Sequence, residues 1–144
     1  MTFDPDVFMS ADNKGELDTE FVNVPEGEYN AVATDLKVRT TQTGKVILDV
    51  SWEINDPEVE KATGRETNTV RQSVFLDMDD SGERISAARG KNISLGRLLE
   101  AVGINMAKPW SLASIKGNVG LVTVKHRMVE DGTVYADVKR VAAA

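Results

Sequence analysis

The chain has 144 residues, no cysteine, one histidine and a formal net charge of −6. The lack of cysteine excludes disulfides, thiolate nucleophiles and zinc sites built on cysteine, and it fits a reducing compartment. No apolar run approaches membrane-spanning length, and the acidic start lacks the basic residues of a secretory signal. We therefore expect a cytoplasmic protein with one domain and no membrane association.

The negative charge is concentrated near the N-terminus. Residues 1–28 hold eight acidic residues against the single Lys14, a net charge of −7, whereas residues 29–144 carry +1. We predict an acidic, partly flexible N-terminal arm (1–23), a folded domain (24–141) and an alanine tail (142–144). The arm is either a solvated terminus or a segment that recruits partners or mimics DNA.

The first strand-like run spans residues 28–40. Its apolar residues switch from one parity to the other, which predicts a β-bulge near Thr34 or Asp35. Residues 41–45, a short polar loop containing Gly44, are typical of a hairpin connection.

The second run, residues 45–55, alternates most clearly. Apolar side chains on one parity predict a strand with one buried face, and Ile47 is the exception on the other parity. Trp52 shares the apolar parity, so we expect it in the core. The residues of that parity are Val46, Leu48, Val50, Trp52 and Ile54.

A third strand and then a helix follow. Residues 67–77 place Val70 and Val74 on one face, with Arg71 and Phe75 on the other. Apolar residues then recur at helical spacing over residues 92–102. Asn92 or Ser94 is the expected N-cap, and Gly103 the expected stop.

The last two strands are predicted as a hairpin. Residues 119–128 and 134–141 flank Asp131-Gly132, a strong turn signal. The resulting order of three strands, one helix and two strands is that of a mainly β fold, a five-stranded OB-like barrel with an acidic N-terminal arm.

The residues offer little for catalysis. His126 lies inside the fourth predicted strand, and no Ser/His/Asp or Glu-x-x-His arrangement can be assembled around it. The string 77–83 has oxygen ligands at alternate positions, but Ala88 stands where an EF-hand needs a bidentate acid. We expect a solvated acidic loop there, and no enzyme, metal site or cofactor.

Nucleic-acid binding needs cations for phosphates and flat side chains for bases, and the folded domain supplies both. The alternative for each residue is that the cations solubilise strand edges and that the aromatic rings close the barrel. Trp110, in the loop after the helix, is either a plug for the barrel or a stacking platform. The candidates are Arg71, Phe75, Lys125, Arg127, Tyr135, Lys139, Lys37, Arg39, Lys45 and Trp110.

Short motifs spread along the chain carry a resemblance to a known group. They are Val24-Pro25-Glu26-Gly27-Glu28-Tyr29, Thr43-Gly44-Lys45, Thr63-Gly64-Arg65, Leu98-Leu99-Glu100-Ala101-Val102-Gly103-Ile104 and Lys116-Gly117. Together they resemble a family of small bacteriophage OB-fold single-stranded DNA-binding proteins, over roughly residues 21–141.

This resemblance implies sequence-tolerant binding of single-stranded DNA in phage replication or recombination, in the host cytoplasm. It leaves open whether the acidic arm recruits replication or recombination proteins and whether the protein forms a homo-oligomer. The alternative function is a non-catalytic assembly or adaptor protein that pairs with other chains through its strand edges.

Overall fold

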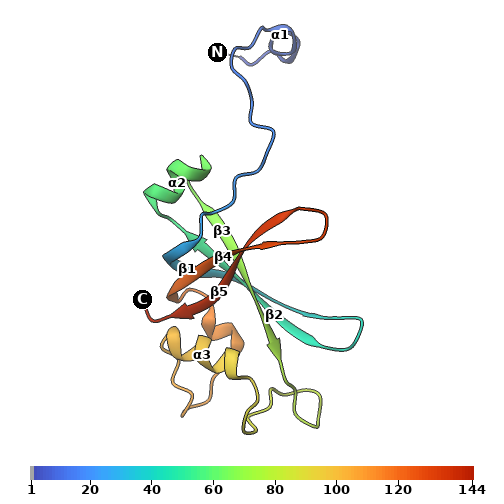
Figure 1. Cartoon of the computed structure of the whole chain (residues 1–144), viewed down its shortest axis with the longest axis vertical. Helices are drawn as coiled ribbons and strands as arrows, with labels where there is room; N and C mark the ends of the chain where they lie inside the picture. The colour runs from blue at the N-terminus through green and yellow to red at the C-terminus, as the bar shows by residue number, and fades with distance from the viewer. Residues whose placement is uncertain (1) are drawn as a thin grey trace.

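A closed barrel of five strands forms the body of the protein in the computed structural model, which describes residues 2–144. Met1, the first residue of the predicted arm, lies outside the described residues. The strand order around the barrel is β1-β2-β3-β5-β4 (Figure 1). The strands are β1 (Gly27–Thr40), β2 (Val46–Ile54), β3 (Asn68–Leu76), β4 (Val119–Met128) and β5 (Val134–Ala142). The predicted mainly β fold is confirmed, and the architecture is consistent with an OB-like barrel.

Four antiparallel pairings and one short parallel contact close this barrel. β1 pairs with both β2 and β4, while β2–β3 and β4–β5 complete the antiparallel set. The parallel contact between β3 and β5 joins Arg71 to Asp137. The predicted bulge in β1 is confirmed, because the register shifts between Ala33 and Asp35.

The barrel interior is filled by the inward parity of each strand. Trp52 is fully buried, as predicted, and its Nε1 donates a hydrogen bond of 3.0 Å to Oε1 of Gln72. Gly120 lies against this core, where an added Cβ would stand 2.6 Å from Cγ1 of Val141 and 3.3 Å from the Trp52 ring. A Cβ at position 120 would clash with Val141, so glycine is what allows the β4 backbone to lie this close to the Trp52 ring.

The helix α3 (Ile93–Ala101) closes one end of the barrel with Leu95, Leu98 and Leu99. It ends as predicted, because Gly103 has the left-handed φ of 79° that suits a residue without a Cβ. A short 3₁₀ helix, η1 (Leu112–Ile115), follows in the connection to β4.

The predicted cap of α3 needs a correction. Asn92 stands at the N-cap with a left-handed backbone and makes no side-chain cap bond. Its side chain instead accepts a hydrogen bond from the backbone N–H of Asp77 and donates to the carbonyls of Asp77 and Ser86. Asn92 therefore holds the loop between β3 and α3, and this contact with a distant segment outweighs the local cap.

Two further helices were not predicted. The helix α2 (Pro57–Thr63) begins at the cap of Asp56 and ends at Gly64, and it buries Val59. The helix α1 (Pro5–Ser10) is exposed, and the segment that carries it extends away from the barrel in Figure 1. Among the described residues, no helix is long and apolar enough to cross a membrane.

Candidate nucleic-acid interface

The outward sides of β1, β2 and β3 form one continuous face. The register aligns Arg39 with Ile47 and Ile47 with Phe75, and the next outward row follows two residues along each strand. That second row consists of Lys37, Asp49 and Ser73, and the third of Asp35, Ser51 and Arg71. We call these nine residues the outer face.

The first row of the outer face is apolar at its centre. Ile47 is 2% exposed although its parity points away from the barrel interior, whereas Phe75 beside it is 59% exposed. Nζ of Lys45 lies 5.7 Å from the centroid of the Phe75 ring. An exposed ring with an ammonium group at its side is suited to hold a flat group and a negative charge together.

The second row is organised by Asp49. Its carboxylate pairs with Nε of Arg39 at 2.7 Å and accepts a hydrogen bond of 2.7 Å from the Ser73 hydroxyl. Burial raises the pKa of Asp49, but the hydrogen bonds from Arg39 and Ser73 outweigh burial, so its pKa lies below the usual value. Asp49 therefore stays ionised and holds Arg39 in place.

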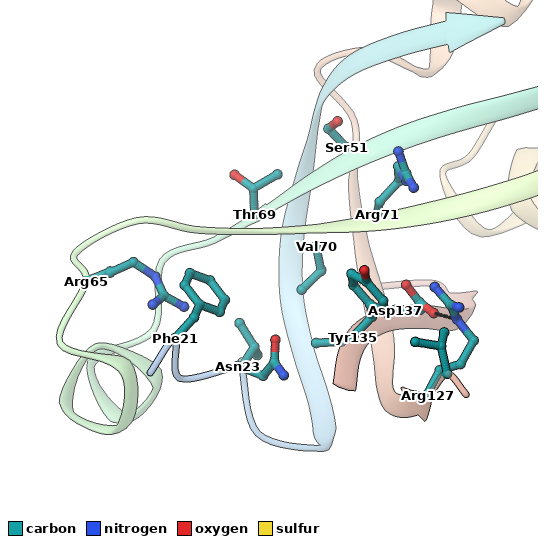
Figure 2. Close-up of a pocket in the computed structure, with 13 residues that line it drawn as sticks. Phe21, Asn23, Ser51, Arg65, Thr69, Val70, Arg71, Arg127, Tyr135 and Asp137 are labelled. Atoms are coloured by element: carbon teal, nitrogen blue, oxygen red, sulfur yellow. Dashed lines mark hydrogen bonds and ion pairs between the residues drawn. The ribbon is translucent and has the colours of Figure 1, made fainter. Parts of the chain in front are cut away.

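The third row leads into a groove beside the β4–β5 hairpin. Arg71 aligns with Asp137 of β5, and Asp137 aligns with Lys125 of β4. A cavity of about 720 Å³ opens here between β3, the hairpin and the chain that enters β1 (Figure 2). We call it the arginine groove, because Arg65, Arg71 and Arg127 all line it.

Each end of the arginine groove carries a guanidinium stacked on an aromatic ring (Figure 2). At one end Cζ of Arg65 lies 4.1 Å from the Phe21 ring centroid. At the other end Cζ of Arg127 lies 5.0 Å from the centroid of Tyr135.

Arg127 is also held by a carboxylate. Its Nε lies 2.7 Å from Oδ2 of Asp137, and this hydrogen bond raises the pKa of Arg127, helped by the attraction between the two charges. The guanidinium is thereby fixed against the Tyr135 ring. Arg71 makes no ion pair within residues 2–144, so its charge is available to a ligand.

The family model described as "Protein of unknown function (DUF669)" matches residues 8–144. The chain belongs to this family. A search of the curated proteins found no match. The family match covers the whole barrel together with most of the N-terminal segment, including the Phe21 that lines the groove.

The DUF669 barrel brings most of the predicted site residues together. Five of them, Lys37, Arg39, Lys45, Arg71 and Phe75, lie on or beside the outer face. Lys125, Arg127 and Tyr135 follow on the hairpin next to Arg71.

Two predicted residues lie elsewhere. Lys139 falls at a β-bulge of the β4–β5 ladder and lines a separate hollow beside α3. Trp110 is half-buried and packs against the core, which fits its reading as a plug for the barrel.

Sequence reasoning missed Phe21 and Arg65. Their contact joins the predicted arm to the loop before β3, and Arg65 also donates a 2.7 Å hydrogen bond from Nη2 to the carbonyl of Val22. Two signals were available: Phe21 is one of the apolar residues that interrupt the acidic arm, and Arg65 directly follows the glycine that ends α2.

The other polar motifs have structural roles. His126 holds the chain that enters β1: its backbone N–H donates to Oε2 of Glu26, and its ring Nε2 lies 2.8 Å from the carbonyl of Val24. The acidic loop is held by Asp79, which accepts hydrogen bonds from Ser81. Within the part of the chain that the structure describes, no three His, Cys, Asp or Glu side chains cluster as a metal site would require.

Proposed function

We propose that this protein binds single-stranded DNA with little sequence preference and without catalysis, as the phage OB-fold proteins that it resembles do in replication or recombination. The observation that carries the proposal is the continuity of the outer face with the arginine groove. Four strands contribute cations and exposed rings to one surface, although those residues lie far apart in the sequence. OB-like barrels bind oligonucleotides on the face of strands 2 and 3.

The chemistry of this surface favours unpaired strands. Phe75 and Tyr135 are both exposed rings, and a ring can stack only on a base whose face is free. In a duplex the base faces are covered by neighbouring pairs. Arg71 lies on β3 on the side of Phe75 that faces the hairpin, and Lys125 aligns with Asp137, the β5 partner of Arg71, so both cations would contact phosphates beside the rings.

The carboxylates on this surface limit how strongly it would attract phosphates. Asp49 pairs with Arg39, and Asp137 pairs with Arg127, so two of the arginines are already partly neutralised. We therefore expect few counterions to be released, and a binding constant that depends on salt less steeply than that of strongly basic proteins.

The test is fluorescence anisotropy of a labelled single-stranded oligonucleotide titrated with the full chain at several salt concentrations. The proposal predicts saturable binding that weakens linearly on a log-log salt plot, with a slope of about 0.7 for each phosphate contacted. An unlabelled duplex of the same length should compete poorly. No binding at low salt, or equal competition by the duplex, would reject the single-strand proposal.

A second candidate function is an assembly or adaptor protein. It is favoured by the exposed apolar side chains of the N-terminal segment, among them Phe3, Phe8 and Met9, all of them about two-thirds exposed or more. Edge pairing receives less support, because β1 is paired along its length, with β4 over its first half and with β2 over its second half, and the second half carries Lys37 and Arg39.

A further inference from the structure

We infer that the acidic segment before β1 regulates the arginine groove, competing with phosphates from a tether at the mouth of the groove. This inference rests on the proposed function and names a regulator for the same site. The regulator is residues 2–20 of the same chain, which hold six acidic residues and one lysine.

The tether is defined by contacts on both walls of the groove. On one wall Arg65 stacks on Phe21 and donates to the carbonyl of Val22. On the other wall Nδ2 of Asn23 donates a 2.9 Å hydrogen bond to the carbonyl of Val134 in β5. The chain therefore leaves the barrel at the groove, and the segment before Phe21 is tethered to the groove through Phe21, Val22 and Asn23.

The charges of the two parts are complementary. Three arginines line the groove, and Asp137 is the only carboxylate among the lining residues. Glu16, Asp18 and Glu20 precede the tether by at most five residues and are exposed. Five residues span at most about 17 Å, so these carboxylates remain near the cavity in any conformation of the segment.

This geometry lets the carboxylates of the segment compete with phosphates for the arginines of the groove. In the structure the acidic segment extends away from the barrel (Figure 1), and within residues 2–144 none of its carboxylates forms an ion pair with Arg65, Arg71 or Arg127. When the segment folds back, its carboxylates meet the same guanidinium groups that a phosphate backbone would use. A short tether gives such groups an effective concentration in the millimolar range, sufficient to compete with a weakly held strand.

Matched triple variants of the full chain test this regulation. The near variant combines Glu16→Gln, Asp18→Asn and Glu20→Gln, and the distant variant combines Asp4→Asn, Asp6→Asn and Asp12→Asn. Both remove three charges from exposed positions, and Asn at position 4 retains the ability to cap α1. Binding of a labelled single-stranded oligonucleotide is measured by anisotropy at low and high salt.

The near variant should bind about three- to tenfold more tightly than the unmodified chain at low salt, and the distant variant less than twofold. The difference should vanish at high salt, where the carboxylates are screened. Equal strengthening by both variants would show an effect of net charge alone and would overturn the inference. Equal affinity of all three forms would overturn it while leaving the proposed function standing, whereas no binding by any form would reject both.

Discussion

Phe75 is the side chain on which the outer face depends most. Its ring is more than half exposed beside buried Ile47, which leaves a flat surface on which an unpaired base could stack. We predict that Phe75→Ala weakens binding of a single-stranded oligonucleotide by about 1–3 kcal/mol, the contribution of one stacked base. Anisotropy titration measures this loss directly.

The control for Phe75 is Ile93→Ala. Ile93 is also an exposed apolar residue, but it lies on α3 and belongs to none of the strand rows of the outer face. Ile93→Ala should leave the affinity for the single-stranded oligonucleotide unchanged. If both substitutions weakened binding equally, the loss would reflect general stability, and the role of Phe75 in stacking would be contradicted.

Gly120 tests the packing of the core at one position. A methyl group there would overlap Val141 and press on Trp52, so we predict that Gly120→Ala destabilises the fold by about 1–3 kcal/mol. Gly96 is the matched control, because it lies inside α3 with open space around it. Gly96→Ala should stabilise the fold by about 0.5–1 kcal/mol.

Urea unfolding of both glycine variants measures these changes. Opposite shifts of the midpoint are expected from the two substitutions. If the Gly120→Ala protein were as stable as the unmodified chain, the tight packing of β4 against Val141 and Trp52 would be contradicted.

The strands were predictable because alternation is a local property. Each predicted run lies within one or two residues of the observed strand, and the bulge in β1 followed from its parity switch. Ile47 shows the limit of this reasoning. Its apolar side chain on the wrong parity was treated as an exception, whereas it is buried on the outer face between Arg39 and Phe75.

The short helices were harder to predict. The helix α2 has seven residues and one buried side chain, so it offers almost no periodicity. Its boundaries were nevertheless encoded, since Asp56-Pro57 is a good start and Gly64 a good stop. The cap of α3 could not be predicted, because the side chain of Asn92 is taken by Asp77 and Ser86.

Asp49 of β2 binds Arg39 of β1 and Ser73 of β3, and this contact predicts that the stability of the barrel depends on pH. The folded-state pKa of Asp49 is lowered, so its ionised form stabilises the fold at pH values above the unfolded pKa of about 3.9. This stability is lost as the pH falls through the lower folded-state pKa.

The measurement is the thermal midpoint of unfolding as a function of pH, compared with Asp49→Asn. The unmodified chain should be more stable at neutral pH, and its advantage should shrink as the pH falls from about 5 to below 3. Asp80→Asn, in the exposed loop after β3, is the control and should follow the unmodified chain. A constant difference between Asp49→Asn and the unmodified chain would contradict the role of this carboxylate.

The arginine groove is a property of the whole molecule. Phe21, Arg65 and Tyr135 meet only when the N-terminal segment, the loop after α2 and the last hairpin come together. No local pattern marks such residues, which explains why sequence reasoning found Arg71, Arg127 and Tyr135 but missed Phe21 and Arg65. Conversely, Lys139 shares sequence parity with Tyr135, yet a bulge moves it to another hollow.

The most direct test of the proposed interface is chemical-shift mapping of the full chain with an unlabelled single-stranded oligonucleotide. The perturbed backbone amides should cluster at residues 37–49 and 69–75 of the outer face, and at 125–137 beside the arginine groove. The amides of α3 and η1 should remain unchanged. Perturbations confined to α3, or none at saturating oligonucleotide, would contradict the assignment of this surface as the site of DNA binding.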